Sequence, residues 1–129
     1  VTQGYPFYSG RMLYSCGFEG TEGSQTFLRL KNPSGTLFNI RLNGRDAGRI
    51  LWRPYLVELT ELVRNGYNDL EIEVVSSLQN TWGPLHEKIG DDNNWCSPAA
   101  FELEKFLREE FSLYDYGLLG GAEIVVLPR

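Results

Sequence analysis

The strongest constraint in this sequence is an alternation of apolar and polar residues with a period of two. In the run TLFNIRLNG, Phe38, Ile40 and Leu42 alternate with Asn39 and Arg41. Successive side chains of a β-strand point to opposite faces, so such a run predicts a strand with one buried and one wet face, typical of antiparallel sheets. The runs YLVELT, DLEIEVV and AEIVVLP repeat the pattern, and their same-face apolar residues are Tyr55, Val57, Leu59, Leu70, Ile72, Val74, Ile124 and Val126.

Turn sequences separate these runs at short intervals. Asn-Gly pairs occupy positions 43–44 and 65–66, Asn-Pro-Ser-Gly occupies 32–35, and Gly-Gly occupies 120–121. Many short strands with such spacing indicate a β-sandwich or a barrel.

Two segments break the alternation and predict short helices. TELVRNG begins with the capping residue Thr60 and ends at Gly66, which predicts a single helical turn. In SPAAFELEKFLREEF, Ser97 is a candidate N-cap and Pro98 occupies the first helical position. We therefore expect an all-β fold with one or two short helices.

Length and charge narrow the range of functions. With 129 residues, the chain is expected to form one domain over 1–129. The net charge is −5 and the basic residues are scattered, which predicts no nucleic-acid partner. The apolar runs are too short to cross a bilayer, which predicts no membrane partner. The opening VTQGYPFYSG is unlike a signal peptide and suggests a fragment of a larger protein, whose compartment cannot be read from this sequence.

Two cysteines are too few for a disulfide framework. Cys16 shares a strand face with Met12, Tyr14 and Phe18, so we expect a buried free thiol. A bridge between Cys16 and Cys96 remains the alternative.

The longest stretch without a strand pattern runs from about 76 to 97 and holds the candidate binding residues. A loop of this length in a compact domain usually carries a function or local structure of its own. Aromatic rings beside convergent polar groups are the general form of a small-ligand site. The alternatives are that the tryptophans plug the end of a sandwich, or that they contact a neighbouring domain. The candidate carbohydrate contacts are Trp82, Trp95, Asn80, His86, Asp92 and Asn94.

The same stretch offers a weak candidate for a metal site. Asp91, Asp92 and Asn93 supply oxygen ligands that suit calcium, although their spacing differs from that of an EF-hand and also fits a solvated turn. No other cofactor is expected. The single histidine, His86, is expected to fix the loop through hydrogen bonds rather than to act as a catalytic base, because the chain has no Gly-x-Ser-x-Gly nucleophile elbow.

Further polar and aromatic groups receive a structural interpretation. Glu71 and Glu73 are expected to face solvent from one strand, and no carboxylate pair has the surroundings of a glycosidase cleft, so catalysis is not expected. Trp52 and Arg53 in LWRPYL could form an exposed aromatic–cation platform. We favour the alternative, a strand packed on the sandwich with Pro54 at an edge or a bulge.

The run from Asn43 to Val75 resembles the galactose-binding-domain-like jelly-roll module of large glycoside hydrolases. Family-2 β-galactosidase-like enzymes and some α-L-rhamnosidases carry such modules. The segments YPFYSGRMLYSCGFE and YDYGLLGGAEIVVLP resemble the module's first and closing strands, and SLQNTWGPLH resembles a loop of C-terminal modules. The residues that match the module's turn and strand pattern are Asn43, Gly44, Gly48, Tyr55, Thr60, Gly66, Asn68 and Leu70.

This resemblance implies an antiparallel β-sandwich of the galactose-binding-like jelly-roll type. It also implies a noncatalytic accessory module, C-terminal in its parent glycoside hydrolase. The expected partners are carbohydrate and the catalytic domain of the parent chain. The alternative is a purely structural or interdomain-interaction sandwich without affinity for sugar.

Overall fold

The computed structural model describes residues 4–82, 86 and 109–127. The chain divides into two compact units, one formed by Val1–Gly10 with Ser77–Asp115 and the other by Arg11–Ser76 with Tyr116–Arg129. Every strand of the described residues belongs to the second unit. The single domain over 1–129 stays a prediction, because this division does not decide whether the units fold independently.

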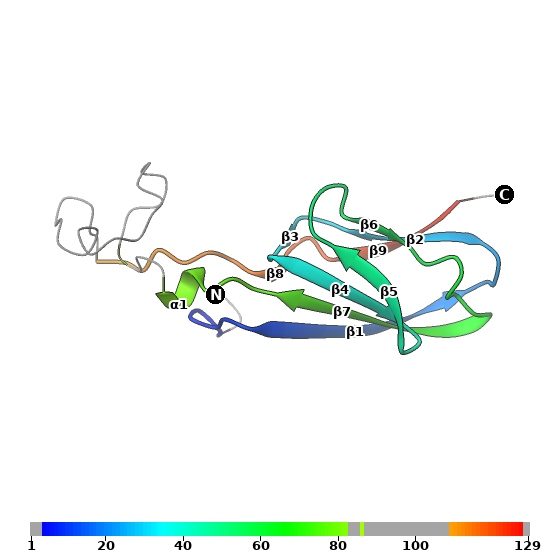
Figure 1. The fold of residues 1–129 in the computed structure, drawn as a ribbon, viewed down its shortest axis with the longest axis horizontal. Helices are drawn as coiled ribbons and strands as arrows, with labels where there is room; N and C mark the ends of the chain where they lie inside the picture. Colours follow the sequence, from blue (N-terminus) through cyan, green and yellow to red (C-terminus); the bar gives the residue numbers. More distant parts are fainter. Residues whose placement is uncertain (1–3, 83–85, 87–108, 128–129) are drawn as a thin grey trace. The chain divides into compact units, whose positions relative to one another are not determined.

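The second unit is an all-β sandwich. A four-stranded sheet has the order β1-β7-β4-β5, a three-stranded sheet has the order β6-β2-β9, and β3 pairs with β8 (Figure 1). All these pairings are antiparallel, which confirms the predicted fold class, while the jelly-roll topology stays a prediction. The strands are β1 (Arg11–Gly20), β2 (Gln25–Leu30), β3 (Pro33–Ser34), β4 (Leu37–Leu42), β5 (Arg45–Ile50), β6 (Leu56–Glu58), β7 (Gly66–Val75), β8 (Gly117–Leu118) and β9 (Ala122–Leu127).

One apolar core lies between the two larger sheets. The alternation in β4 and β7 points one face of each strand into this core, as the sequence predicts. Leu28 and Leu30 of β2 meet that face from the opposite sheet. The other buried members of the core are Phe38, Ile40, Leu42, Ile50, Leu59, Val63, Leu70, Ile72 and Val74.

The Asn-Gly pair at 43–44 forms the tight turn between β4 and β5. Asn43 and Gly44 have φ values of 53° and 76°. Positive φ at both central residues is the requirement of a type I′ hairpin, which Asn-Gly meets at low steric cost. The backbone amide of Asn43 also donates to the carbonyl of Asp69 at 2.8 Å, which ties the hairpin to β7.

A buried asparagine at the start of β7 joins three segments of the sandwich. Asn68 is 0% exposed, and its Nδ2 donates to the carbonyls of Arg64 and Gly66 at 2.9 and 2.8 Å. Its Oδ1 accepts from the Arg64 amide at 2.8 Å and from Asn43 Nδ2 at 2.9 Å. Asn43 Nδ2 also donates to the carbonyl of Leu62 at 3.1 Å. All four hydrogen-bonding positions of the Asn68 amide are therefore used.

The segment before β7 contains one turn, as expected, but Thr60 is not its cap. The amides of Leu62 and Val63 both donate to the carbonyl of Leu59, at 2.9 and 3.1 Å. Thr60 Oγ1 instead accepts from the backbone amide of Thr26 in β2, at 3.1 Å. The hydroxyl thus bonds to β2, the strand that neighbours β6 in the same sheet, which sequence spacing does not reveal.

A short helix, α1 (Gln79–Trp82), lies in the first unit. The helix predicted from Ser97 falls on residues of which 97–108 lie outside the described part. None of the helical residues that the structure describes forms a helix long and apolar enough to cross a membrane.

The expectation of a buried Cys16 thiol is wrong. Cys16 is a free and exposed cysteine in β1. It does lie on the strand face that holds Met12, Tyr14 and Phe18, but β1 is an edge strand of the four-stranded sheet. A facing sheet of three strands leaves part of such an edge uncovered. Cys96 lies outside the described residues.

We predict that Asn68→Ala strongly destabilises the sandwich. The change empties the buried Asn68 site and removes all four of its hydrogen bonds, and a loss of about 3 kcal/mol in the free energy of unfolding is expected. Urea denaturation followed by circular dichroism measures this loss. The control is Asn65→Ala, at an exposed site where the side chain accepts one hydrogen bond from Glu22, and its expected loss is below about 1 kcal/mol. Equal losses in the two variants would contradict the role assigned to Asn68.

Candidate functional site

The face of the four-stranded sheet that points away from the core carries rows of polar side chains. Strand pairing places Glu73 of β7 opposite Asn39 of β4, and Asn39 opposite Arg49 of β5. The next row runs from Glu71 of β7 through Arg41 of β4 to Asp46 of β5. The period-two pattern gathers the residues of β7 and β4 on one surface, and a register shift opposite Ile40 and Arg41 brings both Asp46 and Arg49 of β5 into the same rows.

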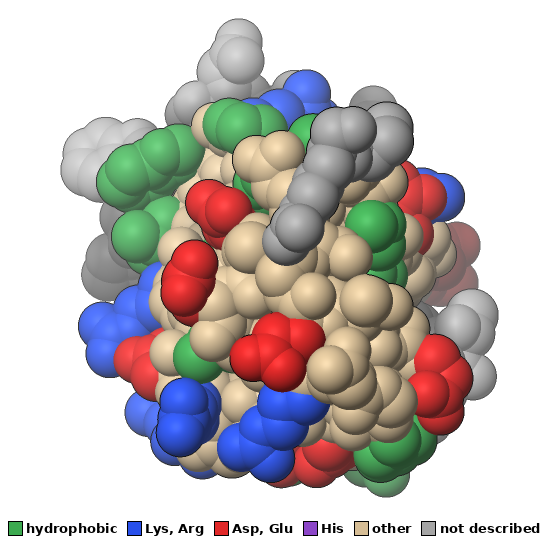
Figure 2. Space-filling view, turned by 90° about the vertical axis from the view of Figure 1, so that its right-hand side faces the viewer, with side chains coloured by type: hydrophobic (Ala, Val, Ile, Leu, Met, Phe, Trp, Pro, Cys, Tyr) green, Lys and Arg blue, Asp and Glu red, His purple; other side chains and the backbone are tan. Residues whose placement is uncertain are grey.

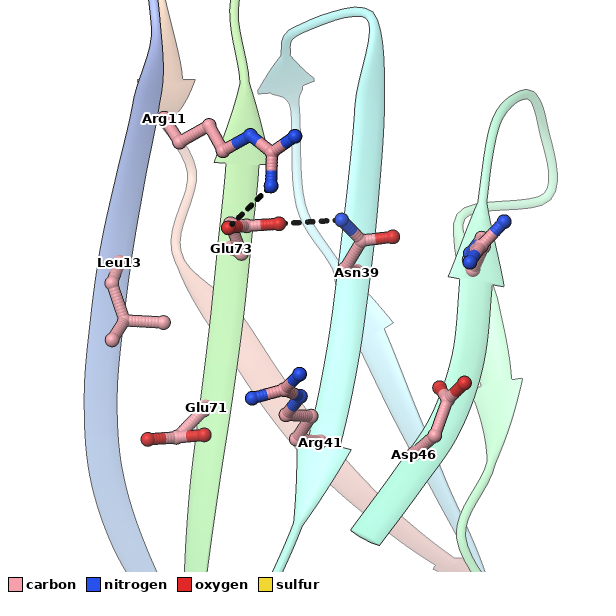
Figure 3. A pocket seen from close by; sticks show the side chains of 8 residues that line it. Arg11, Leu13, Asn39, Arg41, Asp46, Glu71 and Glu73 are labelled. Carbon is pink, nitrogen blue, oxygen red and sulfur yellow. Dashed lines mark hydrogen bonds and ion pairs between the residues drawn. The ribbon is translucent and has the colours of Figure 1, made fainter. Parts of the chain in front are cut away.

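This surface is hollowed into an open pocket of about 370 Å³. Figure 3 shows the side chains of β1, β7, β4 and β5 around it. The volume lies near the lower limit of ligand pockets, roughly 300–1,000 Å³. We call this the outer-face pocket, and its lining residues are Arg11, Leu13, Asn39, Arg41, Asp46, Arg49, Glu71 and Glu73.

One end of the outer-face pocket is a fixed polar cluster around Glu73. Asn39 Nδ2 donates to Glu73 Oε2 at 2.5 Å, and Arg11 Nη1 lies 3.5 Å from Glu73 Oε1 (Figure 3). The Asn39 hydrogen bond and then the positive charge of Arg11 hold the pKa of Glu73 below its ordinary value of 4.5. Arg41 acts in the same direction through its charge, while desolvation opposes the shift. Glu73 is therefore ionised at neutral pH.

The other charged side chains of the pocket make fewer hydrogen bonds and ion pairs. Asp46 Oδ1 accepts from the amide of Gly48 at 2.9 Å. Within the described residues, no side-chain hydrogen bond or ion pair occupies Arg41, Arg49 or Glu71. Two guanidinium groups and two carboxylates thus remain able to bind further groups from outside the chain.

Sequence reasoning identified several of these residues but did not group them. The alternation in sequence places Asn39, Arg41, Glu71 and Glu73 on solvent-facing strand faces, where ordinary solvent exposure is the expectation. Their grouping depends on pairing between β4 and β7, about thirty residues apart, and on Arg11 reaching Glu73 from β1. Opposite charges at matching strand positions were the available signal.

The loop predicted to bind carbohydrate begins with a hydrogen-bonded corner. Asn80 of α1 is 2% exposed; its Nδ2 donates to the carbonyl of Tyr114 at 2.8 Å, and its Oδ1 accepts from the Tyr114 amide at 2.9 Å. In the same unit, Thr81 Oγ1 donates to the carbonyl of Phe7 at 2.9 Å. A sugar would reach Asn80 only if this corner moved, and its carbohydrate contact stays a prediction.

His86 is the other predicted carbohydrate contact whose side chain the structure describes. It is exposed, and its ring centroid lies 4.5 Å from that of Phe111 with the planes inclined by 37°. Phe111 also meets Phe7 edge-on, at 5.1 Å. Trp82 ends α1, but its side chain lies outside the described part. Also outside it are the remaining predicted carbohydrate and calcium ligands, Asp91, Asp92, Asn93, Asn94 and Trp95.

The favoured interpretation of LWRPYL as a packed strand is wrong. Residues 51–55 form a loop between β5 and β6, and Trp52 is 72% exposed. Pro54 has no amide to donate to a strand ladder, which explains the break between the strands. The guanidinium carbon of Arg53 lies 6.0 Å from the centroid of the Tyr55 ring, so the cation–aromatic contact that exists here involves Tyr55.

Charge is interspersed over the described surface. Figure 2 shows acidic and basic side chains mixed across the end of the sandwich near the β4–β5 hairpin, with visible hydrophobic side chains in separate small groups. Among the residues that the structure describes, no group of three or more His, Cys, Asp or Glu side chains is arranged to hold a metal ion.

We predict that Asn39→Ala raises the pKa of Glu73 toward 4.5. The hydrogen bond from Asn39 is the larger cause of the lowered pKa, and an NMR titration of the Glu73 side-chain carboxyl carbon measures it. Because the folded-state pKa is lowered, the Glu73 cluster stabilises the fold above about pH 4.5, and this stabilisation is lost as the pH falls through the folded-state pKa. An unchanged Glu73 pKa in Asn39→Ala would contradict the role assigned to this hydrogen bond.

We also predict that Asn80→Ala loosens the corner around Tyr114. Loss of both hydrogen bonds should accelerate hydrogen exchange of the Tyr114 amide by about tenfold or more. The neighbouring variant Gln79→Ala is the control, because its side chain is exposed. If the Tyr114 amide exchanged at the same rate in Asn80→Ala, the structural role assigned to Asn80 would be wrong.

Comparisons with known proteins find similarity in solved structures alone. No protein-family model and no curated protein matches the chain. A rhamnosidase from Novosphingobium sp. PP1Y matches 92% of this chain with a TM-score of 0.64 and 28% sequence identity. The β-glucuronidase of Bifidobacterium dentium matches 88% with a TM-score of 0.53 and 22% identity, which shows a shared fold. The chain spans 11% of the rhamnosidase and 20% of the glucuronidase, so it is similar to a small part of each glycoside hydrolase.

Proposed function

We propose that this chain is a noncatalytic accessory module of a glycoside hydrolase and that it binds carbohydrate. The observation that carries the proposal is the match to the rhamnosidase, which covers nearly all of this chain and only 11% of that enzyme. A segment of this size is far smaller than the whole hydrolase. The resemblance of Asn43 to Val75 to galactose-binding-like modules supports the same role.

The state of Glu73 supports a noncatalytic role for the outer-face pocket. Glycoside hydrolysis needs one carboxyl group that stays protonated to act as general acid, commonly through a raised pKa. Glu71 and Glu73 are two positions apart on one strand, but the pKa of Glu73 is lowered. Glu73 is therefore unsuited to be the proton donor of a glycosidase.

Interdomain packing is the second candidate role, and it has an observation of its own. Leu51 and Trp52 are adjacent, and both are more than half exposed in the β5–β6 loop. Exposed apolar groups of this kind occur where another domain docks. The catalytic domain of the parent chain is the partner that this proposal implies, and carbohydrate binding and packing can coexist on different surfaces.

Affinity electrophoresis and a hydrolysis assay test the proposed function together. We expect the purified chain to migrate more slowly in native gels that contain a recognised polysaccharide, with rhamnogalacturonan, galactan and xylan as the panel. The matched control is the same gel without polysaccharide. We also expect no hydrolysis of nitrophenyl glycosides at high protein concentration.

The outcomes separate the alternatives. Measurable hydrolysis by the chain itself would contradict the noncatalytic role. Unchanged migration in every polysaccharide would remove the carbohydrate-binding part of the proposal and favour interdomain packing. Retention without hydrolysis would agree with the accessory-module role.

A further inference from the structure

The outer-face pocket presents hydrogen-bond donors and acceptors in a fixed alternation. The guanidinium groups of Arg41 and Arg49 act as donors alone, whereas the carboxylate of Glu71 acts as an acceptor alone. They alternate because neighbouring positions on β7, β4 and β5 carry opposite charges, in the row Glu71, Arg41, Asp46. Each residue comes from a strand whose backbone is held by its ladder.

The charges of the pocket cancel. Three arginines and three carboxylates line it, and Arg11 is already paired with Glu73. An anionic ligand would gain from the arginines but would meet Asp46 and Glu71 as well. A neutral ligand with many hydroxyl groups fits better, because each hydroxyl both donates and accepts. Sugar hydroxyls can accept from Arg41 or Arg49 and donate to Glu71 in the same site.

An apolar side chain completes this arrangement. Leu13 of β1 lines the pocket and is 61% exposed. It lies opposite Glu73 in the strand pairing, at the edge of the polar rows (Figure 3). The C–H face of a sugar ring can rest on such a side chain while its hydroxyls meet the charged groups.

We propose that the outer-face pocket binds a neutral saccharide through Arg41, Arg49 and Glu71, with Leu13 against the apolar face of the ring. This inference rests on the proposed carbohydrate-binding function and locates it on the sheet face instead of the predicted loop. The fixed Asn39–Glu73–Arg11 cluster forms one wall of the site. The pocket takes up the ligand without covalent chemistry.

The test is an NMR titration of the whole chain with labelled arginine side chains. The probes are L-rhamnose, D-galactose, D-glucose and D-xylose, with D-glucuronate as the anionic comparison. We expect at least one neutral sugar to shift the Nε–Hε signals of Arg41 and Arg49 in a saturable way. Arg45 lies on β5 but outside the pocket, and its signal should stay unchanged. Raising the salt concentration should leave this affinity nearly unchanged, because the ligand is uncharged.

Two variants and one control connect the signal to the site. Arg41→Ala and Glu71→Gln should each weaken binding by about tenfold, the usual effect of losing a charged hydrogen bond. Arg45→Ala should bind as the unchanged chain does. Thermal melting checks that each variant folds, which we expect because these side chains lie on the solvent face of the sheet.

The possible results test the outer-face site separately from the proposed carbohydrate-binding function. If a sugar binds with no response at Arg41 and Arg49 and with full affinity in both variants, the outer-face site is wrong while the accessory role stands. The same holds if polysaccharide retards the chain in gels but no neutral sugar shifts these signals. If glucuronate binds and the neutral sugars do not, the neutral class is overturned. If neither gels nor titrations detect any carbohydrate, both the site and the carbohydrate-binding function fail.

Discussion

The buried amide of Asn68 is the interaction on which the arrangement of the sandwich depends. It lies at the start of β7, which pairs with β1 on one side and with β4 on the other. Its four hydrogen bonds fix the chain entering β7 and reach the β4–β5 hairpin through Asn43. An aspartate has no amide hydrogens to donate and a leucine has no polar atoms, so neither residue meets the needs of this site. The presence of Asn68 among the residues that match the module pattern thus has a direct physical cause.

In the four-stranded sheet, alternation places the residues that stabilise the fold on the inner face and the residues of the candidate site on the outer face. The inner residues of its strands fill the core, where truncation of a buried aliphatic side chain costs roughly 2–5 kcal/mol. Their outer residues form exposed cross-strand pairs that contribute roughly 0.2–1 kcal/mol each. Glu71 and Arg41 are of this second kind, whereas their sequence neighbours Leu70, Ile72 and Ile40 are buried. The outer face can therefore carry a binding site without weakening the fold.

Local sequence predicted β1, β4, β6, β7 and β9, the inward faces of β4 and β7, and the Asn-Gly hairpin, because period and turn chemistry are local properties. It failed where the answer depended on partners distant in the chain. Cys16 is exposed because β1 is an edge strand, and Thr60 bonds to Thr26 of β2, which neighbours β6 in the sheet but lies about thirty residues earlier in the chain. The outer-face pocket was missed for the same reason, since Arg11 and Glu73 meet only when β1 pairs with β7. The predicted loop site stays a prediction, although Asn80 within it is bonded to Tyr114.

A saccharide site on this sheet would take its selectivity from backbone geometry. Neighbouring strands lie roughly 4.8 Å apart, and same-face residues along β7 and along β4 lie roughly 6.6 Å apart. A register shift brings Asp46 and Arg49, three positions apart on β5, into the same rows. The polar groups therefore occupy a lattice of backbone positions that the ladders hold fixed. Positions fixed by strands are more precise than positions on a loop. Because the charges of the pocket sum to zero, long-range attraction contributes little, and recognition depends on the match between this lattice and the hydroxyls of the ligand. Stereoisomers that differ at one hydroxyl should then be distinguished by whether that group meets a guanidinium or a carboxylate.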